Sequence, residues 1–228
     1  MKKRSKRYKE IFKTAIRDKK ISAKEIIDLV KKNSTCKFDE SIDVSLRINL
    51  KQSKGGDLNL RTIVNLPNGS GKKSKVAVLC ESDKLEEAKK SGAEVIGSDD
   101  LLEKIASGKI DFTKLVCTPA MMGKIGKHGK VLGPQGLMPN PKLGTVTNDI
   151  TKAVKNIKTG LVEIRNDKDG NLASTIGRKS FSSEKLLDNY NHFIESVKKE
   201  KPETIKGEFV KNAYITSTMG ISYKVGAK

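Results

Sequence analysis

The segment 123–145, GKIGKHGKVLGPQGLMPNPKLGT, is dense in glycine, proline and lysine. Glycine lets a backbone approach a partner closely and expose its amide groups, and lysine adds mobile positive charge. Together these residue types favour a partner that is rich in phosphate.

A nucleotide site in an enzyme is the alternative for such a glycine-rich segment. However, Gly123, Gly126 and Gly129 follow the spacing G-x-x-G-x-x-G, not the dinucleotide-binding pattern G-x-G-x-x-G. The sequence GSGKKS at 69–74 resembles a phosphate-binding loop only in part, because Lys73 stands where a magnesium-binding Ser or Thr belongs. A nucleotide-binding enzyme is therefore supported mainly by the glycine content of these segments, and not by a complete motif.

A second candidate is the sequence TSTMG at 216–220, in which three hydroxyl side chains precede Met219 and Gly220. Short hydroxyls and an approachable backbone can contact the 2′-hydroxyls and phosphates of folded RNA, and Met can lie against a sugar or base. The alternative is an ordinary β-turn, and the spacing alone favours the turn.

Phe38, in the sequence KFDES at 37–41, could stack on a base or enter the hydrophobic core, and the core is the commoner fate. The chain has only ten Phe and Tyr residues and no Trp, too few for a platform that stacks single-stranded bases. Duplex or compactly folded RNA is the favoured partner.

Catalytic and metal-binding residue sets are not evident in the sequence. Cys36, Cys80 and Cys117 form no CxxC pair, which predicts free thiols in a reducing cytosol. His128 and His192 have no recognisable catalytic or metal-binding partners. We therefore predict no catalytic residue, no metal, no cofactor and a cytoplasmic location.

Charge is both high and unevenly distributed. Lys and Arg number 46 against 27 Asp and Glu, a formal net charge of +19. Residues 1–20 hold ten basic and two acidic side chains, and residues 121–158 hold seven lysines and one acid, whereas 68–120 hold nine of each sign. Such segregation indicates a protein that meets a polyanion along defined strips.

An anionic membrane is the weaker alternative, because the sequence has no long apolar run and no signal peptide.

The elements at the two ends of the chain share an α+β style. A basic helix is expected up to Lys20, and Ser22 with Glu25 forms a capping box that predicts a second helix. We expect strands at 42–50, 60–66, 161–165, 172–176, 209–216 and 221–225, with 161–165 and 172–176 joined as a hairpin, and a long helix whose apolar face runs from 186 to 197.

The middle of the chain has a different pattern of predicted helices and strands. Short apolar strands at 76–80, 94–96 and 115–117 alternate with helices at 83–91 and 99–107, which predicts parallel β-α-β units in three layers. We infer a Rossmann-like α/β domain, 68–159, inserted into a split α+β domain, 1–67 and 160–228. The two adjacent linkers predict a hinge.

Five segments then carry a resemblance to a known family. KFDES, LRTIVNLPNGSGK, GKHGKVLGPQGLMPNPKLGT, RNDKDG and TSTMG are similar to the bacterial-type ribosomal protein L-one family, and the similarity extends over essentially the whole chain. The resemblance implies a split α+β domain with an inserted Rossmann-like domain. It also implies a structural constituent of the large ribosomal subunit that is a monomer off the ribosome.

The resemblance further implies three RNA partners: the stalk region of large-subunit rRNA, the exit-site tRNA whose release it assists, and the leader of its own messenger, whose translation it represses. The residues that it implies for RNA binding are Lys37, Phe38, Ser41, Asp43, Arg178, Ser180, Phe181, Thr218, Met219 and Gly220, with a secondary RNA-facing loop at Lys130, Gly133, Gln135 and Lys142.

Two positions depart from the family pattern. Gln135 occupies a place that is usually basic, which removes one phosphate contact. Arg178 stands where Lys is usual, which keeps the charge but changes the hydrogen-bond geometry.

Overall fold

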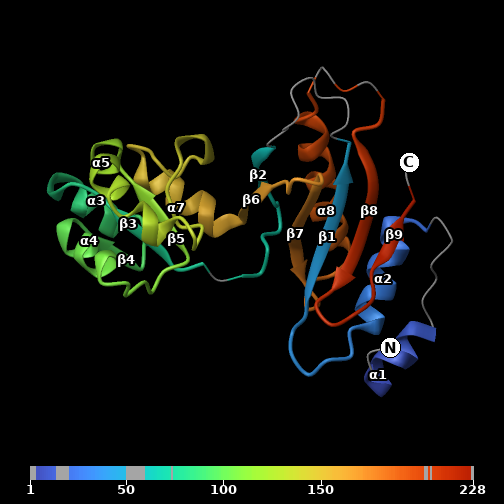
Figure 1. Cartoon of the computed structure of the whole chain (residues 1–228). Helices are drawn as coiled ribbons and strands as arrows, with labels where there is room; N and C mark the ends of the chain where they lie inside the picture. Colours follow the sequence, from blue (N-terminus) through green and yellow to red (C-terminus); the bar gives the residue numbers. More distant parts are fainter. Residues whose placement is uncertain are drawn as a thin grey trace. The chain divides into compact units, whose positions relative to one another are not determined.

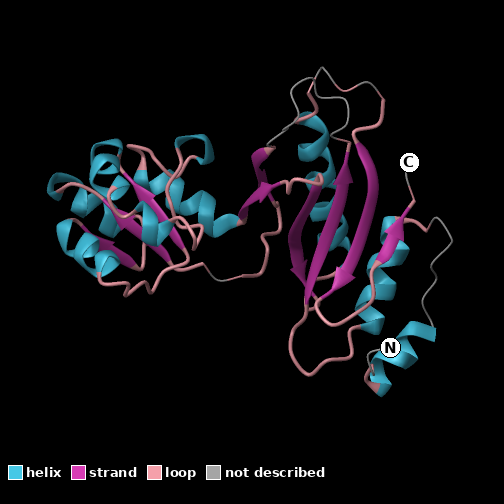
Figure 2. Cartoon of the chain, viewed as in Figure 1, coloured by secondary structure: helices cyan, strands magenta, loops and turns pink. Residues whose placement is uncertain are grey.

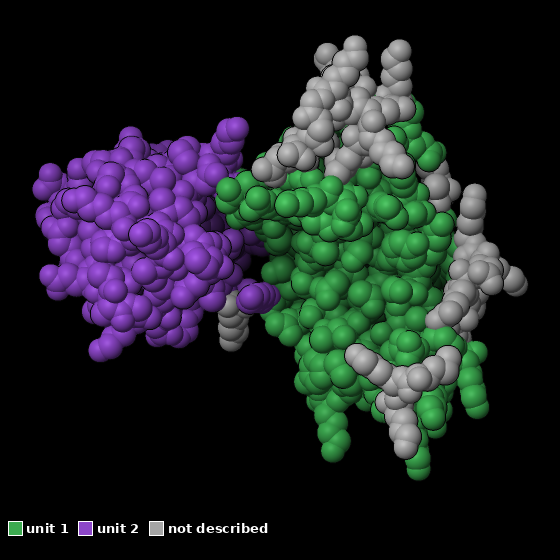
Figure 3. Space-filling model, viewed as in Figure 1, with its two compact units in different colours: residues 1–71, 162–228 green, residues 72–161 purple. Residues whose placement is uncertain are grey.

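The computed structural model describes residues 4–13, 21–49, 60–72, 74–202, 205 and 207–226. The chain divides into two compact units, which Figure 3 colours separately: residues 1–71 with 162–228, here called the split unit, and residues 72–161, here called the inserted unit. Each unit is described by itself.

The split unit is built on a four-stranded antiparallel sheet of order β7-β1-β8-β9 (Figure 1). Strands β2 and β6 form a separate two-stranded sheet. The elements are α1 (Lys6–Lys13), α2 (Ala23–Asn33), β1 (Ser41–Ile48), β2 (Arg61–Asn65), β6 (Leu161–Arg165), β7 (Asn171–Arg178), α8 (Ser183–Lys199), β8 (Val210–Ser217) and β9 (Tyr223–Val225).

Alternating apolar residues explain how this sheet packs. In β1, Ile42, Val44 and Leu46 are buried on one face, and the residues between them point to the other. Helices α2 and α8 cover the buried face, as Figure 2 shows. Both helices begin at a capping serine whose hydroxyl accepts a backbone N–H: Ser22 before α2 and Ser182 before α8.

The inserted unit has a parallel three-stranded sheet of order β4-β3-β5. One face packs on α4, α5 and α6 and the other on α3 and α7, so the unit has three layers. Its elements are β3 (Val76–Leu79), η1 (Ser82–Lys84), α3 (Leu85–Lys90), β4 (Val95–Gly97), α4 (Asp99–Ala106), β5 (Lys114–Cys117), η2 (Pro119–Met121), α5 (Met122–Gly126), α6 (Gly129–Leu132), η3 (Pro141–Leu143) and α7 (Ile150–Thr159).

The predicted fold class is confirmed: an α+β unit with an antiparallel sheet and a parallel α/β unit occur in one chain. The predicted hairpin between 161–165 and 172–176 is wrong, because β6 pairs with β2 while β7 pairs with β1. The buried Asn166 side chain contributes to this choice, since its Oδ1 accepts the Leu60 backbone N–H at 2.6 Å and so ties the end of β6 to the start of β2.

Two further expectations change. The glycine-rich segment 123–145 is not simply a loop, since it contains most of α5, all of α6 and η3. Helix α1 ends at Lys13, and the rest of the predicted N-terminal helix, 14–20, lies outside the described residues.

Candidate nucleic-acid interface

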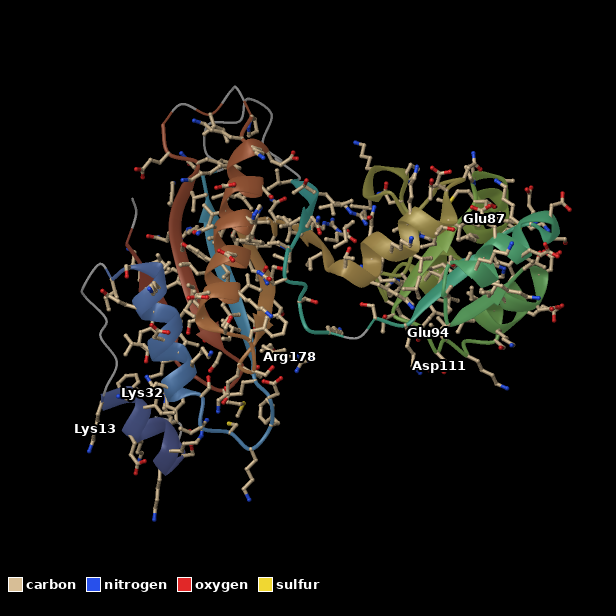
Figure 4. All side chains as sticks on the ribbon, turned by 180° about the vertical axis from the view of Figure 1, so that it is seen from behind. Lys13, Lys32, Glu87, Glu94, Asp111 and Arg178 are labelled. Atoms are coloured by element: carbon tan, nitrogen blue, oxygen red, sulfur yellow. The ribbon has the colours of Figure 1, made fainter. Side chains whose placement is uncertain are left out.

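Three segments that are distant in sequence meet at one end of the four-stranded sheet. Strand β1 starts where its antiparallel neighbours β7 and β8 end, with Ser41 opposite Arg178 and Ile42 opposite Ser217. Figure 4 labels Arg178 at this end of the split unit. We call the surface formed by residues 37–41, 178–181 and 218–220 the sheet-end surface.

The sheet-end surface brings together nine of the ten residues in the first predicted set, and Asp43 lies two residues further along β1. Asp43 is held by the Thr175 hydroxyl, which donates to its Oδ1 at 2.6 Å. The ten residues therefore form one neighbourhood, although 183 positions separate Lys37 from Gly220 in the sequence.

Two large apolar side chains are exposed on this surface. Phe38 is 50% and Met219 49% exposed, and they are the exposed large hydrophobic residues of the described part of the chain. The alternative that Phe38 enters the core is therefore wrong. The turn expected at 216–220 does form, since the Gly220 N–H donates to the Ser217 carbonyl at 3.1 Å, and this turn presents Met219. Because these two side chains lie on segments that meet at one end of the sheet, we take this surface as the candidate contact site.

Two hydroxyl residues, Ser41 and Thr218, join the start of β1 to the turn that carries Met219. The Ser41 N–H donates to Thr218 Oγ1 at 3.0 Å, the Thr218 N–H donates to the Ser41 carbonyl at 3.1 Å, and the two hydroxyl oxygens are 3.0 Å apart. This mutual bonding fixes the start of β1 against the turn after β8. Thr218 is exposed and Ser41 partly so, and hydroxyls at such positions can contact ribose or phosphate oxygens.

Asp39 fixes the third segment, at the end of β7. Its Oδ1 accepts the Ser180 N–H at 3.0 Å and its Oδ2 the Ser180 hydroxyl at 2.9 Å. Arg178 Nη1 donates to the Asp39 carbonyl at 3.1 Å. Phe181 is only partly buried and packs against the main core of the split unit. The predicted Arg178 and Ser180 are thus oriented by an acidic residue that the sequence did not single out.

Glu40 is a fully buried carboxylate beneath the same surface. Oε1 accepts the Cys36 N–H at 3.2 Å and Oε2 the Met219 N–H at 3.1 Å. Burial alone raises the pKa of Glu40, but hydrogen bonds from the Met219 amide, the Ser217 hydroxyl and Cys36 outweigh burial, so the pKa lies below its ordinary value. Glu40 therefore carries its negative charge while holding backbone groups.

Cationic side chains surround the surface. Lys37 is exposed, Lys179 Nζ donates to the Ser34 carbonyl, and Lys31 Nζ donates to the Phe181 carbonyl at 2.5 Å. Exposed lysines on α1 and α2, among them Lys13 and Lys32 labelled in Figure 4, add positive charge to the same unit. The electrostatic setting suits an anionic partner.

The second predicted set lies in the inserted unit. Lys130 belongs to α6, Gly133 ends that helix, Gln135 follows, and Lys142 belongs to η3; all four are exposed. The segment is anchored from below by three buried leucines, Leu132, Leu137 and Leu143. It forms a separate, ordered surface.

Metal binding, membrane insertion and thiol chemistry can each be judged from the residues that the structure describes. There, no group of three or more His, Cys, Asp or Glu residues could hold a metal ion. No described helix combines the length and the apolar character needed to cross a membrane. Cys36, Cys80 and Cys117 are free, and burial raises the pKa of the Cys117 thiol to about 11. The Cys117 thiol is therefore protonated and a poor nucleophile at neutral pH.

An α+β unit interrupted by a parallel α/β unit defines the class of this molecule as a mixed α/β protein of two units. The model of the ribosomal protein L1p/L10e family matches residues 30–221, and the chain belongs to this family, whose members are structural and not enzymatic.

Similar proteins cover almost the same length. The chain is 54% identical to the large ribosomal subunit protein uL1 of Pelagibacter ubique, over 97% of this chain and 96% of that protein. It is 48% identical to the protein of the same name in Bifidobacterium adolescentis, over 95% and 94% of the two chains, and 46% identical to that in Thermosipho melanesiensis, over 99% and 97%.

Proposed function

We propose that this protein is a structural constituent of the large ribosomal subunit and binds the stalk region of large-subunit rRNA with the sheet-end surface. The observation that carries the proposal is the pair of exposed apolar side chains, Phe38 and Met219, on segments whose backbone is held by hydrogen bonds with Ser41, Glu40 and Arg178. The names of the relatives support the ribosomal setting.

The mechanism follows from the groups at this surface. Lysines and Arg178 neutralise phosphates and displace counterions, which supplies most of the affinity. The hydroxyls of Ser41 and Thr218 and the backbone around Gly220 read ribose and phosphate geometry, while Met219 and Phe38 pack on sugar or base faces. Because the surface is held before binding, little ordering entropy is lost when RNA binds.

The inserted unit makes the secondary contacts of this proposal, through Lys130, Gly133, Gln135 and Lys142. We propose that the chain has two separate domains, 1–67 with 160–228 and 68–159, whose bounds differ by a few residues from those of the two compact units. In this proposal the inserted domain moves on its two linkers, which allows the protein to follow the stalk and assist release of deacylated tRNA from the exit site.

The proposal extends to regulation. An RNA leader in the protein's own messenger that mimics the rRNA site would occupy the same surface, so that free protein represses its own translation. The free protein is proposed to be monomeric and cytoplasmic, with no membrane, metal or cofactor involved.

Replacing Met219 with Glu tests the site. A carboxylate at this exposed position repels phosphate and removes the apolar contact, so affinity for a stalk rRNA fragment should fall by about tenfold or more while the fold remains intact. Asn191→Glu is a matched control, since Asn191 is exposed on α8 and the change in charge is the same. Filter binding measures both variants, and equal affinity of M219E and wild type would remove the 218–220 turn from the site.

A further inference from the structure

The Met219 turn is held through its backbone by two side chains, those of the buried Glu40 and the partly exposed Arg7. The Met219 N–H donates to Glu40 Oε2 at 3.1 Å. Arg7 Nη2 donates to the Met219 carbonyl at 2.9 Å. The backbone N–H and the backbone carbonyl of Met219 are therefore both hydrogen-bonded to side chains from distant parts of the chain.

Glu40 joins the turn to the loop that carries Phe38. Its second carboxylate oxygen accepts the Cys36 N–H at 3.2 Å, two residues before Phe38. One buried carboxylate thus links the backbones that present the two exposed apolar side chains. Because Glu40 is 0% exposed, it cannot itself touch an RNA bound at the surface.

Arg7 brings helix α1 into the same arrangement. Its Nη1 also donates to the Thr35 hydroxyl at 3.5 Å, so the guanidinium bridges the 218–220 turn and the segment that follows α2. Helix α1 is docked by Ile11, which is buried in the core of the split unit. A rigid planar donor on a docked helix suits a role in positioning.

We propose that Glu40 and Arg7 are positioning residues for RNA binding: they hold the N–H and the carbonyl of Met219 and, through Cys36 and Thr35, the Phe38 loop in the geometry that RNA meets. The inference rests on the proposed function of the sheet-end surface. It assigns to an acidic residue and to the N-terminal helix a part in recognition that involves no phosphate contact.

Glu40→Gln is the main test. The amide keeps the size of the side chain but offers one acceptor oxygen in place of two, so one of the Cys36 and Met219 N–H groups loses its partner. We expect faster amide hydrogen exchange at Met219 or Cys36, with the amides in the centre of β1 unchanged, and affinity for the stalk rRNA fragment weaker by about tenfold. Glu195→Gln, at an exposed position on α8, is the control for the same chemical change.

Arg7→Ala tests the other contact, with Lys9→Ala as the control, because Lys9 is an exposed residue of the same helix and the loss of charge is equal. Removing a cation that contacts phosphate makes the slope of log affinity against log salt concentration less steep. Removing a positioning residue lowers the affinity but leaves this slope unchanged. We expect R7A to bind several-fold more weakly than K9A with an unchanged slope, and Arg7→Lys, which keeps one donor group, to be intermediate.

The outcomes separate the two proposals. If wild type does not prefer the stalk fragment to an unrelated hairpin, the proposed function fails and the inference falls with it. If wild type binds selectively while E40Q and R7A bind within twofold of their controls, only the inference is overturned. A reduced salt slope in R7A would make Arg7 a phosphate contact and overturn its assignment. Should E40Q fail to fold, R7A and R7K decide the question.

Discussion

At the scale of single residues, the two neighbouring acids Asp39 and Glu40 stand out, because they lie within a surface that we propose binds a polyanion. Their charges would repel phosphate if they pointed outward unpaired. Instead the Asp39 carboxylate accepts two hydrogen bonds from Ser180, and the Glu40 carboxylate is buried under backbone N–H groups. The acids therefore orient the surface and leave the exposed contacts to cations, hydroxyls and apolar groups.

The lowered pKa of Glu40 leads to a pH prediction. A carboxyl whose pKa is lower in the folded state than the ordinary value of 4.5 stabilises the fold above that ordinary pKa, and the stabilisation is lost as the pH falls through the folded-state pKa. The thermal midpoint of wild type should therefore exceed that of E40Q at pH 7, and the gap should close as the solution is acidified below pH 4.5. A gap that stays constant over this range would show that Glu40 is not the titrating group.

Gly220 gives a second prediction at this scale. A Cβ at Gly220 would collide with the Ser217 hydroxyl, which itself bonds to Glu40. Gly220→Ala should therefore lower the free energy of unfolding by about 1–3 kcal/mol and weaken RNA binding, because Ser217 must move. Gly126→Ala, where a Cβ meets open space, should not lower the free energy of unfolding. Urea unfolding and filter binding measure the two effects, and a fully stable, fully binding G220A would contradict this view of the turn.

The sequence predicted residues that lie exposed on the sheet-end surface, but not the residues that hold them in place. Phe38 and Met219 lie in motifs that could be identified by composition and family resemblance. Glu40 and Arg7 act through partners 179 and 212 residues away in the sequence, and no local pattern encodes such contacts. Glu40 is also an unexpected residue at this place, because an acidic side chain is not expected near the phosphates of a bound RNA.

At the scale of elements, the periodicity of apolar residues predicted most helices and strands well, but not which strands pair. The pattern around Gly170, whose φ is +81°, does form a turn, and yet the strands on its two sides belong to different sheets. The tertiary contact between Asn166 and Leu60, 106 residues apart, contributes to the pairing of β6 with β2, and local turn rules cannot include such a contact. Helix α7 was not predicted, although Ile150, Val154 and Ile157 have helical spacing.

Asn189 of α8 connects three parts of the split unit and supports a prediction at this scale. This fully buried side chain donates to the Gly69 and Ile176 carbonyls at 2.9 and 2.7 Å, and accepts the Asn68 N–H at 3.0 Å. It thereby fixes the segment from which the chain enters the inserted unit.

Asn189→Leu should lower the free energy of unfolding by about 2 kcal/mol or more, because it leaves buried backbone groups without partners. Amide exchange should also accelerate at Asn68. Asn191→Leu, at an exposed position of the same helix, is the control for the residue types. If urea unfolding gave equal stabilities for both variants, Asn189 would have no anchoring role.

At the scale of the whole molecule, a net charge of +19 is concentrated outside the balanced stretch 68–120. The fold divides the chain into a unit that holds the sheet-end surface and a unit that holds the exposed lysines Lys130 and Lys142. The charge distribution predicted a polyanionic partner in general terms. Selectivity for one folded RNA requires the ordered hydroxyl and apolar groups of the sheet-end surface as well.

Selective binding of a folded rRNA can be measured by filter binding of the wild-type protein to a stalk rRNA fragment and to an unrelated hairpin, at physiological and at doubled salt. Neutralisation of roughly four phosphates gives about a tenfold fall in affinity for each RNA when the salt is doubled. We predict that the stalk fragment binds at least about a hundredfold more tightly than the hairpin at both salt concentrations, because the shape-reading contacts are less sensitive to salt. Equal affinity for the two RNAs would show that the protein does not recognise the stalk rRNA selectively.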